Sequence, residues 1–284
     1  MIPWPVWLLR VLWVLLPVVA APALSEALDA RSTAVGIVLE VFAWAGWAIG
    51  LVAVLVLRGV SLTAIRVVSR LAVAGLVWAA VTEETGFEHV AAVAYAAVCV
   101  VVAQAPTLGA AFVDGSSYGP ERRLPLRPPA AVALGPAQLA TAVIGAGVLT
   151  GPLLLAAGQW IAGAVALVVG PPAAAVAFRA LHGLNRRWLV LVPGGVVVHD
   201  PLTLTDPVLL PKEALVAIEA ATTDTDAVDL TQRAPGLAVE IRLTDPGQFA
   251  LARPGDEGEI VTAGAVLVTP TLPATTIEAV RDRF

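Results

Sequence analysis

The sequence has little cysteine and little charge. Cys99 is the only cysteine among 284 residues, so the chain can form no internal disulfide. Charged residues make up 14% of the chain, against about 25% in an ordinary soluble domain. Hydrophobic residues make up 58%, and the mean hydropathy is +0.85. This balance excludes a disordered, collagen-like or simple soluble protein and indicates a multi-pass membrane protein.

Several motifs of enzyme chemistry are also lacking. The sequence contains no His-Glu-x-x-His pair, no phosphate-binding Walker loop, no Gly-x-Ser-x-Gly elbow and no metal-spaced set of Cys and His. The sequence therefore shows none of these motifs for hydrolytic or nucleotide-driven activity. We expect a protein that is not an enzyme, with no catalytic residue, no metal site and no cofactor.

Charge is distributed unevenly along the chain. Residues 1–187 contain 11 basic and 8 acidic side chains, whereas residues 188–284 contain 6 basic and 14 acidic ones, a net charge of −8. This change in charge density predicts a transmembrane domain over 1–185 and a separate domain over 186–284. The acidity of the second domain argues against nucleic acid as a partner.

Apolar runs in the first domain are long enough to cross a bilayer as helices, which needs about 20 residues each. The turn of the last helical hairpin is open between Gly151-Pro152 and Gly158-Gln159, and the second choice gives two helices of similar length. The six expected spans are Trp4–Leu24, Ala34–Leu57, Ser61–Val81, His89–Phe112, Pro136–Ala157 and Gln159–Ala180.

The placement of arginine sets the expected orientation. With the N-terminus inside, the inner connections contain nine arginines and the outer connections contain only Arg31. Both termini are then cytoplasmic, and the expected location is the cell (cytoplasmic) membrane. The alternative for the first run is a signal peptide cleaved near Ala21–Ala23. A proline inside that site, and the lack of a basic residue before Arg10, argue against cleavage.

Polar side chains inside apolar runs are costly and are therefore the first candidates for function. Arg10 and Glu40 are expected in opposite leaflets, too far apart to pair. Glu40 is either a ligand for a proton or cation, or a protonated structural carboxyl. Gln104 and Gln138 are candidates to line a polar pocket with Arg10, or else they hydrogen-bond between helices.

Two further groups have a functional and a structural interpretation. Arg66 and Arg70 lie four residues apart on one helix face, as an anionic-lipid site of the inner leaflet or as a positive-inside anchor. An acidic group in an outer connection is a candidate divalent-cation site, although a solvated loop is the favoured interpretation. Its members are Glu83, Glu84, Glu88 and His89.

Small residues spaced by four also occur in the apolar runs. Gly46-x-x-x-Gly50 and Gly147-x-x-x-Gly151 are faces on which helices approach closely. We expect them to serve packing within the chain more than dimerisation, and a homo-oligomer stays open.

Residues 188–284 have the pattern of a strand-rich domain. Pro193-Gly194-Gly195 is a hairpin turn between two β-branched runs. The final residues, 273–284, have helical spacing. Strands are expected at 188–192, 196–199, 208–210, 214–220, 237–243, 249–252 and 263–268.

About seven short strands followed by one helix resemble the bacterial pleckstrin-homology-like domain. The resemblance rests on residues 187–200 and on residues 266–273, which lead into the final helix. The whole chain resembles bacterial multi-pass membrane proteins that carry such a domain. The resemblance implies an α+β fold, a small barrel with a C-terminal helix at one end, and binding of lipids, peptides or proteins. Because acidic head groups need a basic face, we expect a protein or peptide partner.

The expected fold is therefore an α-helical transmembrane bundle of about six helices followed by the pleckstrin-homology-like barrel. The expected function is a membrane scaffold or accessory protein that contacts membrane lipids and presents its acidic domain to a partner. The alternative is a small transporter or lipid-handling protein with a regulatory cytoplasmic domain. A membrane-embedded enzyme acting on lipids needs paired acid and base residues at one depth, and we identify no such pair.

Overall fold

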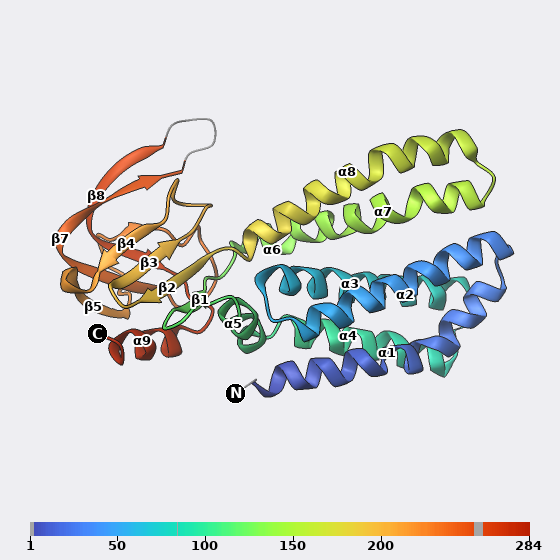
Figure 1. The fold of residues 1–284 in the computed structure, drawn as a ribbon, viewed down its shortest axis with the longest axis horizontal. Coiled ribbons are helices and arrows are strands. Elements are labelled where there is room, and N and C mark those ends of the chain that lie inside the picture. Colours follow the sequence, from blue (N-terminus) through green and yellow to red (C-terminus); the bar gives the residue numbers. More distant parts are fainter. Residues whose placement is uncertain (1–2, 84, 253–257) are drawn as a thin grey trace. The chain divides into compact units, whose positions relative to one another are not determined.

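The structure is a computed structural model that describes residues 3–83, 85–252 and 258–284 (Figure 1). The chain forms two compact units. The helical unit comprises Met1–Ala111 and Pro136–His182, and the strand-rich unit comprises Phe112–Gly135 and Gly183–Phe284. Residues 112–135, which the sequence places in the transmembrane domain, therefore pack with the strand-rich unit.

Long apolar helices make up the helical unit. In the described part of the chain, five helical stretches are long and apolar enough to cross a membrane, and a bent pair makes a sixth. This confirms several apolar helices, the architecture that a multi-pass membrane protein requires. The helices of this unit are α1 (Trp4–Asp29), α2 (Thr33–Leu55), α3 (Gly59–Thr82), α4 (Phe87–Ala103), α5 (Pro106–Asp114), α7 (Pro136–Ala156) and α8 (Trp160–Leu184). The short α6 (Ala130–Leu134) lies in the segment that belongs to the strand-rich unit.

The fourth predicted span is not one straight helix. The sequence predicts a single helix over His89–Phe112, but α4 and α5 are bent by 57° at a break between them. Gln104 and Ala105 form the break, and Pro106 begins α5. Proline has no N–H group and disfavours helical backbone at the residue before it, which favours a break at Ala105.

Glycines hold α7 and α8 close together. The hairpin turns between Ala156 and Trp160, which confirms the second of the two expected turn positions. Gly158 adopts φ +77° there, a conformation that glycine accepts without strain. A Cβ atom on Gly147 would lie 2.5 Å from the carbonyl oxygen of Gly170, so the two backbones are in direct contact. The pair that includes Gly147 therefore packs within the chain.

Two reciprocal indole–carbonyl hydrogen bonds join α1 and α2. Nε1 of Trp13 donates to the carbonyl oxygen of Trp47 at 2.8 Å, and Nε1 of Trp47 donates to that of Trp13 at 2.9 Å. The carbonyl of Trp13 lacks its helical donor because Pro17, four residues later, has no N–H. Gly50 leaves space for the buried Trp13 ring, which a Cβ atom at that position would overlap.

Two four-stranded sheets form the strand-rich unit. The first has the order β1-β2-β3-β4 and is antiparallel throughout, and the second has the order β5-β7-β8-β6, with β6 parallel to β8. The elements are β1 (Arg122–Pro125), β2 (Trp188–Val192), β3 (Gly195–His199), β4 (Val208–Pro211), the short 3₁₀ turn η1 (Lys212–Ala214), β5 (Leu215–Ala220), β6 (Val228–Asp229), β7 (Val239–Leu251), β8 (Glu259–Val268) and α9 (Pro273–Arg281).

Single bridges link the two sheets. They join Leu126 to Pro270 and Leu204 to Leu251. Among the described residues no continuous strand ladder closes the sheets into a barrel. One apolar core nevertheless combines both sheets and α9, with Phe249 and Val266 fully buried at its centre.

The expected strands are present, with three differences, the first of which is the short β6 at 228–229, where no strand was expected. The runs 237–243 and 249–252 form one strand, β7, whose register shifts between Arg242 and Gly247. Pro246 cannot donate to the ladder, so this site interrupts the pairing without ending the strand. β1 was not predicted, because two of its four residues are arginines.

A buried ion pair lies at the start of β2. Nε and Nη2 of Arg187 donate to the two carboxylate oxygens of Asp200 at 2.7 and 2.6 Å, and both side chains are at most 1% exposed. Nη1 of Arg187 donates to the carbonyl oxygen of Arg127 at 2.7 Å. This guanidinium therefore holds together the ends of β2 and β3 and the chain that follows β1.

We predict that Trp47→Phe lowers the stability of the helical unit by about 1 kcal/mol, because the carbonyl oxygen of Trp13 loses its donor in apolar surroundings. Pro17→Ala supplies a backbone N–H to the same oxygen, so it should stabilise the Trp47→Phe protein more than the wild type. Thermal unfolding in detergent, followed by circular dichroism, measures both effects. The control is Trp44→Phe, since Trp44 is 54% exposed. Equal losses from Trp44→Phe and Trp47→Phe would contradict the hydrogen-bond explanation.

Arg187→Ala should destabilise the strand-rich unit by about 3–5 kcal/mol, because it leaves the carboxylate of Asp200 buried without its partner. Arg186→Ala is the matched control, since Arg186 is the exposed neighbour, and we expect a change below about 0.5 kcal/mol. Limited proteolysis of the full chain in detergent, at increasing urea, measures the difference. Similar protease resistance of the two variants would show that the ion pair contributes little.

Candidate functional site

Arg10 interacts with the C-terminal end of α2. Its Nε donates to the carbonyl oxygen of Val54 at 2.9 Å, and Nη2 donates to that of Leu55 at 3.4 Å. The last carbonyls of a helix have no helical donor and carry the negative end of the helix dipole. The ring of Trp7 lies 4.8 Å from the guanidinium carbon. The geometry therefore gives Arg10 a capping role.

Arg66 plays the same role for α4. Its Nε donates at 3.1 Å to the carbonyl oxygen of Ala103, the last residue of α4. Gly109 of α5 leaves room for the guanidinium, since a Cβ atom there would lie 3.2 Å from Nη2. Arg70 donates from Nη1 to the carbonyl oxygen of Arg66 at 3.2 Å. Both arginines predicted to bind anionic lipid thus make contacts inside the helical unit.

The other predicted intramembrane residues do not form an enclosed polar site. Glu40 is exposed on α2 and precedes Val54 by 14 residues, which is about 21 Å along a helix. Gln104 is exposed at the break after α4, and Gln138 is exposed near the start of α7. A continuous polar path through these residues and Arg10 therefore has no support in the geometry.

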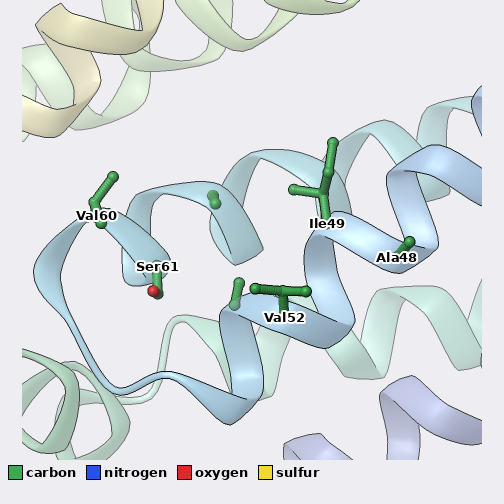
Figure 2. Close-up of a pocket in the computed structure, with 7 residues that line it drawn as sticks. Ala48, Ile49, Val52, Val60 and Ser61 are labelled. Carbon is green, nitrogen blue, oxygen red and sulfur yellow. The ribbon is translucent and has the colours of Figure 1, made fainter.

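A hollow of about 390 Å³ lies between α2 and the start of α3 (Figure 2). Ser61 supplies the one hydroxyl group of its lining, and the remaining six side chains are alanine, valine or isoleucine. Such a lining matches a hydrocarbon chain better than a polar solute. The seven residues are Ala48, Ile49, Val52, Ala53, Val60, Ser61 and Ala64.

The structure confirms only part of the acidic group that was predicted in an outer connection. Glu83 pairs with Arg31 at 3.6 Å, and Glu84 lies outside the described residues. Glu88 and His89 begin α4, where the backbone N–H of Gly86 donates to Nδ1 of His89 at 3.4 Å. Glu83 is thus paired with Arg31 and is not among the residues that lie with Glu88 and His89 at one possible metal site.

Glu26 of α1 joins Glu88 and His89. One possible ligand atom from each residue lies within 4.8 Å of those of the other two. Sequence analysis missed Glu26 because more than 60 residues separate it from Glu88, and no local spacing connects them. We call Glu26, Glu88 and His89 the His89 cluster.

His199 of the strand-rich unit, which directly precedes the buried Asp200, has a lowered pKa. The rings of Trp188 and His199 lie 5.0 Å apart on neighbouring strands. Burial lowers the pKa of His199, and the positive charges of Arg186 and Arg123 lower it further, against an opposing contribution from Asp200. His199 is therefore neutral at pH 7, and its protonation is disfavoured in the folded state.

The surface of the strand-rich unit carries many carboxylates. Its two segments together contain 11 basic and 16 acidic residues, a net charge of −5, because residues 112–135 and 183–187 add basic side chains. Asp200 is buried and paired, whereas most of the other described carboxylates are exposed. The exposed ones are Asp114, Asp206, Glu213, Asp224, Asp226, Asp229, Asp245, Glu259, Glu278 and Asp282.

Comparisons with known proteins do not identify a relative of this chain, since no protein-family model, curated protein or solved structure matches it.

Proposed function

We propose that the chain is a scaffold or accessory protein of the cytoplasmic membrane, with both termini in the cytoplasm, whose strand-rich unit docks a protein or peptide partner. The observation that carries the proposal is the separate, fully cored strand-rich unit with an acidic surface, joined to long apolar helices. A unit that has its own core can present a binding surface at the membrane without taking part in the packing of the helices.

We also propose that the strand-rich unit is a pleckstrin-homology-like domain. Two sheets that share one core, and a C-terminal helix packed against that core, support this assignment. The proposal includes β1, so the domain would take one strand from the segment between α5 and α7.

The docking surface is proposed at the connection between β5 and β7, which includes the short strand β6. Asp224, Asp226 and Asp229 are exposed there, although one carboxylate oxygen of Asp229 accepts the backbone N–H of Thr231 at 2.7 Å. Three carboxylates in six residues favour a basic protein segment over an acidic lipid head group.

The orientation can be tested with single cysteines. In a Cys99→Ser background, Ser32→Cys places a thiol before α2 and Tyr118→Cys places one after α5, and both positions are exposed. We expect a membrane-impermeant maleimide to label Ser32→Cys in intact cells and Tyr118→Cys only after lysis. The reverse labelling would contradict cytoplasmic termini.

Docking can be tested with the tagged full chain, purified in mild detergent and analysed by native mass spectrometry. We expect a stoichiometric protein partner whose recovery falls at least about tenfold with Asp224→Asn/Asp226→Asn, since charge complementarity sets register and association. The control is Glu278→Gln/Asp282→Asn, which removes two charges at exposed positions near α9. Equal recovery with both double variants, or recovery of lipid alone, would contradict the proposal.

A further inference from the structure

The His89 cluster brings together residues from two helices of the helical unit. Glu26 lies in the last turn of α1, and Glu88 and His89 lie in the first turn of α4. Each offers one atom that can bind a metal ion, and the three atoms lie within 4.8 Å of one another. Acidic side chains alone would be ordinary at a helix end, so the histidine decides how the cluster is interpreted.

His89 is 0% exposed, and one of its ring nitrogens has no partner. The N–H of Gly86 donates to Nδ1 at 3.4 Å, so Nε2 is the ring nitrogen that lacks a partner in the described part of the chain. Within the described residues no acceptor hydrogen-bonds to Nε2, and its neighbour Oε2 of Glu26 is 3.9 Å away. A buried polar atom without a hydrogen-bonding partner is unfavourable, so Nε2 is the atom of the cluster at which a bound group is expected.

The distances in the cluster fit ligands of one ion better than hydrogen bonds. Two donors at tetrahedral metal–ligand lengths of about 2.0–2.2 Å are about 3.4 Å apart. The separation is 3.9 Å for Nε2 of His89 and Oε2 of Glu26. A small rotation of Glu26 would bring Oε2 onto an ion that Nε2 holds, and the ligand atom that Glu88 offers lies within 4.8 Å of those of the other two residues.

The donor set points to a class of metal. One imidazole nitrogen with two carboxylate oxygens suits Zn²⁺ and its first-row neighbours, whereas Ca²⁺ and Mg²⁺ favour oxygen alone. The side chains of Glu26 and Glu88 are 50% and 46% exposed, so an ion can reach them from solvent. Three protein donors leave a fourth position for water.

We propose that the His89 cluster is a binding site for Zn²⁺ or a divalent ion of the same class, held by Nε2 of His89 and one carboxylate oxygen from each of Glu26 and Glu88. Binding of the ion to Nε2 places the proton of the neutral ring on Nδ1, so the long hydrogen bond from the N–H of Gly86 is given up when the ion binds. The ion joins the end of α1 to the start of α4. The site lies in the helical unit and does not depend on partner docking.

The test uses tag-free full-length protein in detergent, with Co²⁺ as the spectroscopic probe and Zn²⁺ as the competitor. We expect one equivalent of Co²⁺ to give the intense visible absorption of low-coordinate Co²⁺, and one equivalent of Zn²⁺ to abolish it. Glu26→Gln should weaken binding at least about tenfold, and His89→Asn should abolish it. The matched control is Glu83→Gln, because Glu83 is nearby but pairs with Arg31.

Several results would overturn the site. They are a lack of saturable Co²⁺ binding, wild-type affinity in Glu26→Gln, an equal loss in Glu83→Gln, or displacement by Ca²⁺ or Mg²⁺ as effective as by Zn²⁺. His89 is buried, so its variant can fail to fold. In that case Glu26→Gln and Glu88→Gln, which change half-exposed side chains, decide the question.

Discussion

Backbone polar groups in apolar surroundings must find a hydrogen-bonding partner, and the helical unit depends on this constraint. Arg10 and Arg66 donate to the terminal carbonyls of α2 and α4. The indole of Trp47 serves the carbonyl that Pro17 leaves without a donor. The hydroxyl of Tyr95 donates to the carbonyl oxygen of Leu12 at 3.0 Å. Polar side chains that the sequence offers as functional candidates, such as Arg10 and Arg66, therefore donate hydrogen bonds to backbone carbonyls of other helices.

The same constraint explains why Arg10 and Arg66 are candidates for function in the sequence and capping residues in the structure. An arginine in an apolar run is costly whether it binds substrate or closes a helix end, so the sequence cannot separate the two roles. Arg10 and its acceptor Val54 are 44 positions apart, and Arg66 and Ala103 are 37 apart. Only the packed helices bring these groups together. The His89 cluster differs, because Nε2 of His89 has no hydrogen-bond partner in the part of the chain that the structure describes.

Strong periodic signals were sufficient for most of the fold. Apolar runs located the long helices, and the hairpin turn at Pro193-Gly194-Gly195 located β2 and β3. The missed features depend on contacts over long sequence separations. In the sequence β1 has the pattern of a basic loop, and only its pairing with β2 makes it a strand. Glu26 is a single acidic residue near a helix end in the sequence, and its proximity to Glu88 and His89 depends on the packing of α1 with α4. Pro106 is a local signal for the break, but it lies inside an apolar run for which the sequence predicts one helix.

The origin of β1 has a consequence for synthesis. Its residues, 122–125, leave the ribosome more than 60 residues before β2 at 188–192, and α7 and α8 are made in between. Until then β1 has no strand to pair with, and Leu124 is not covered. Arg187 and Asp200, which form the buried ion pair, are likewise made only after α8. Completion of the strand-rich unit thus waits for insertion of the last apolar hairpin. A nascent chain stalled within that hairpin would expose an unpaired strand, which is a target for chaperones and proteases.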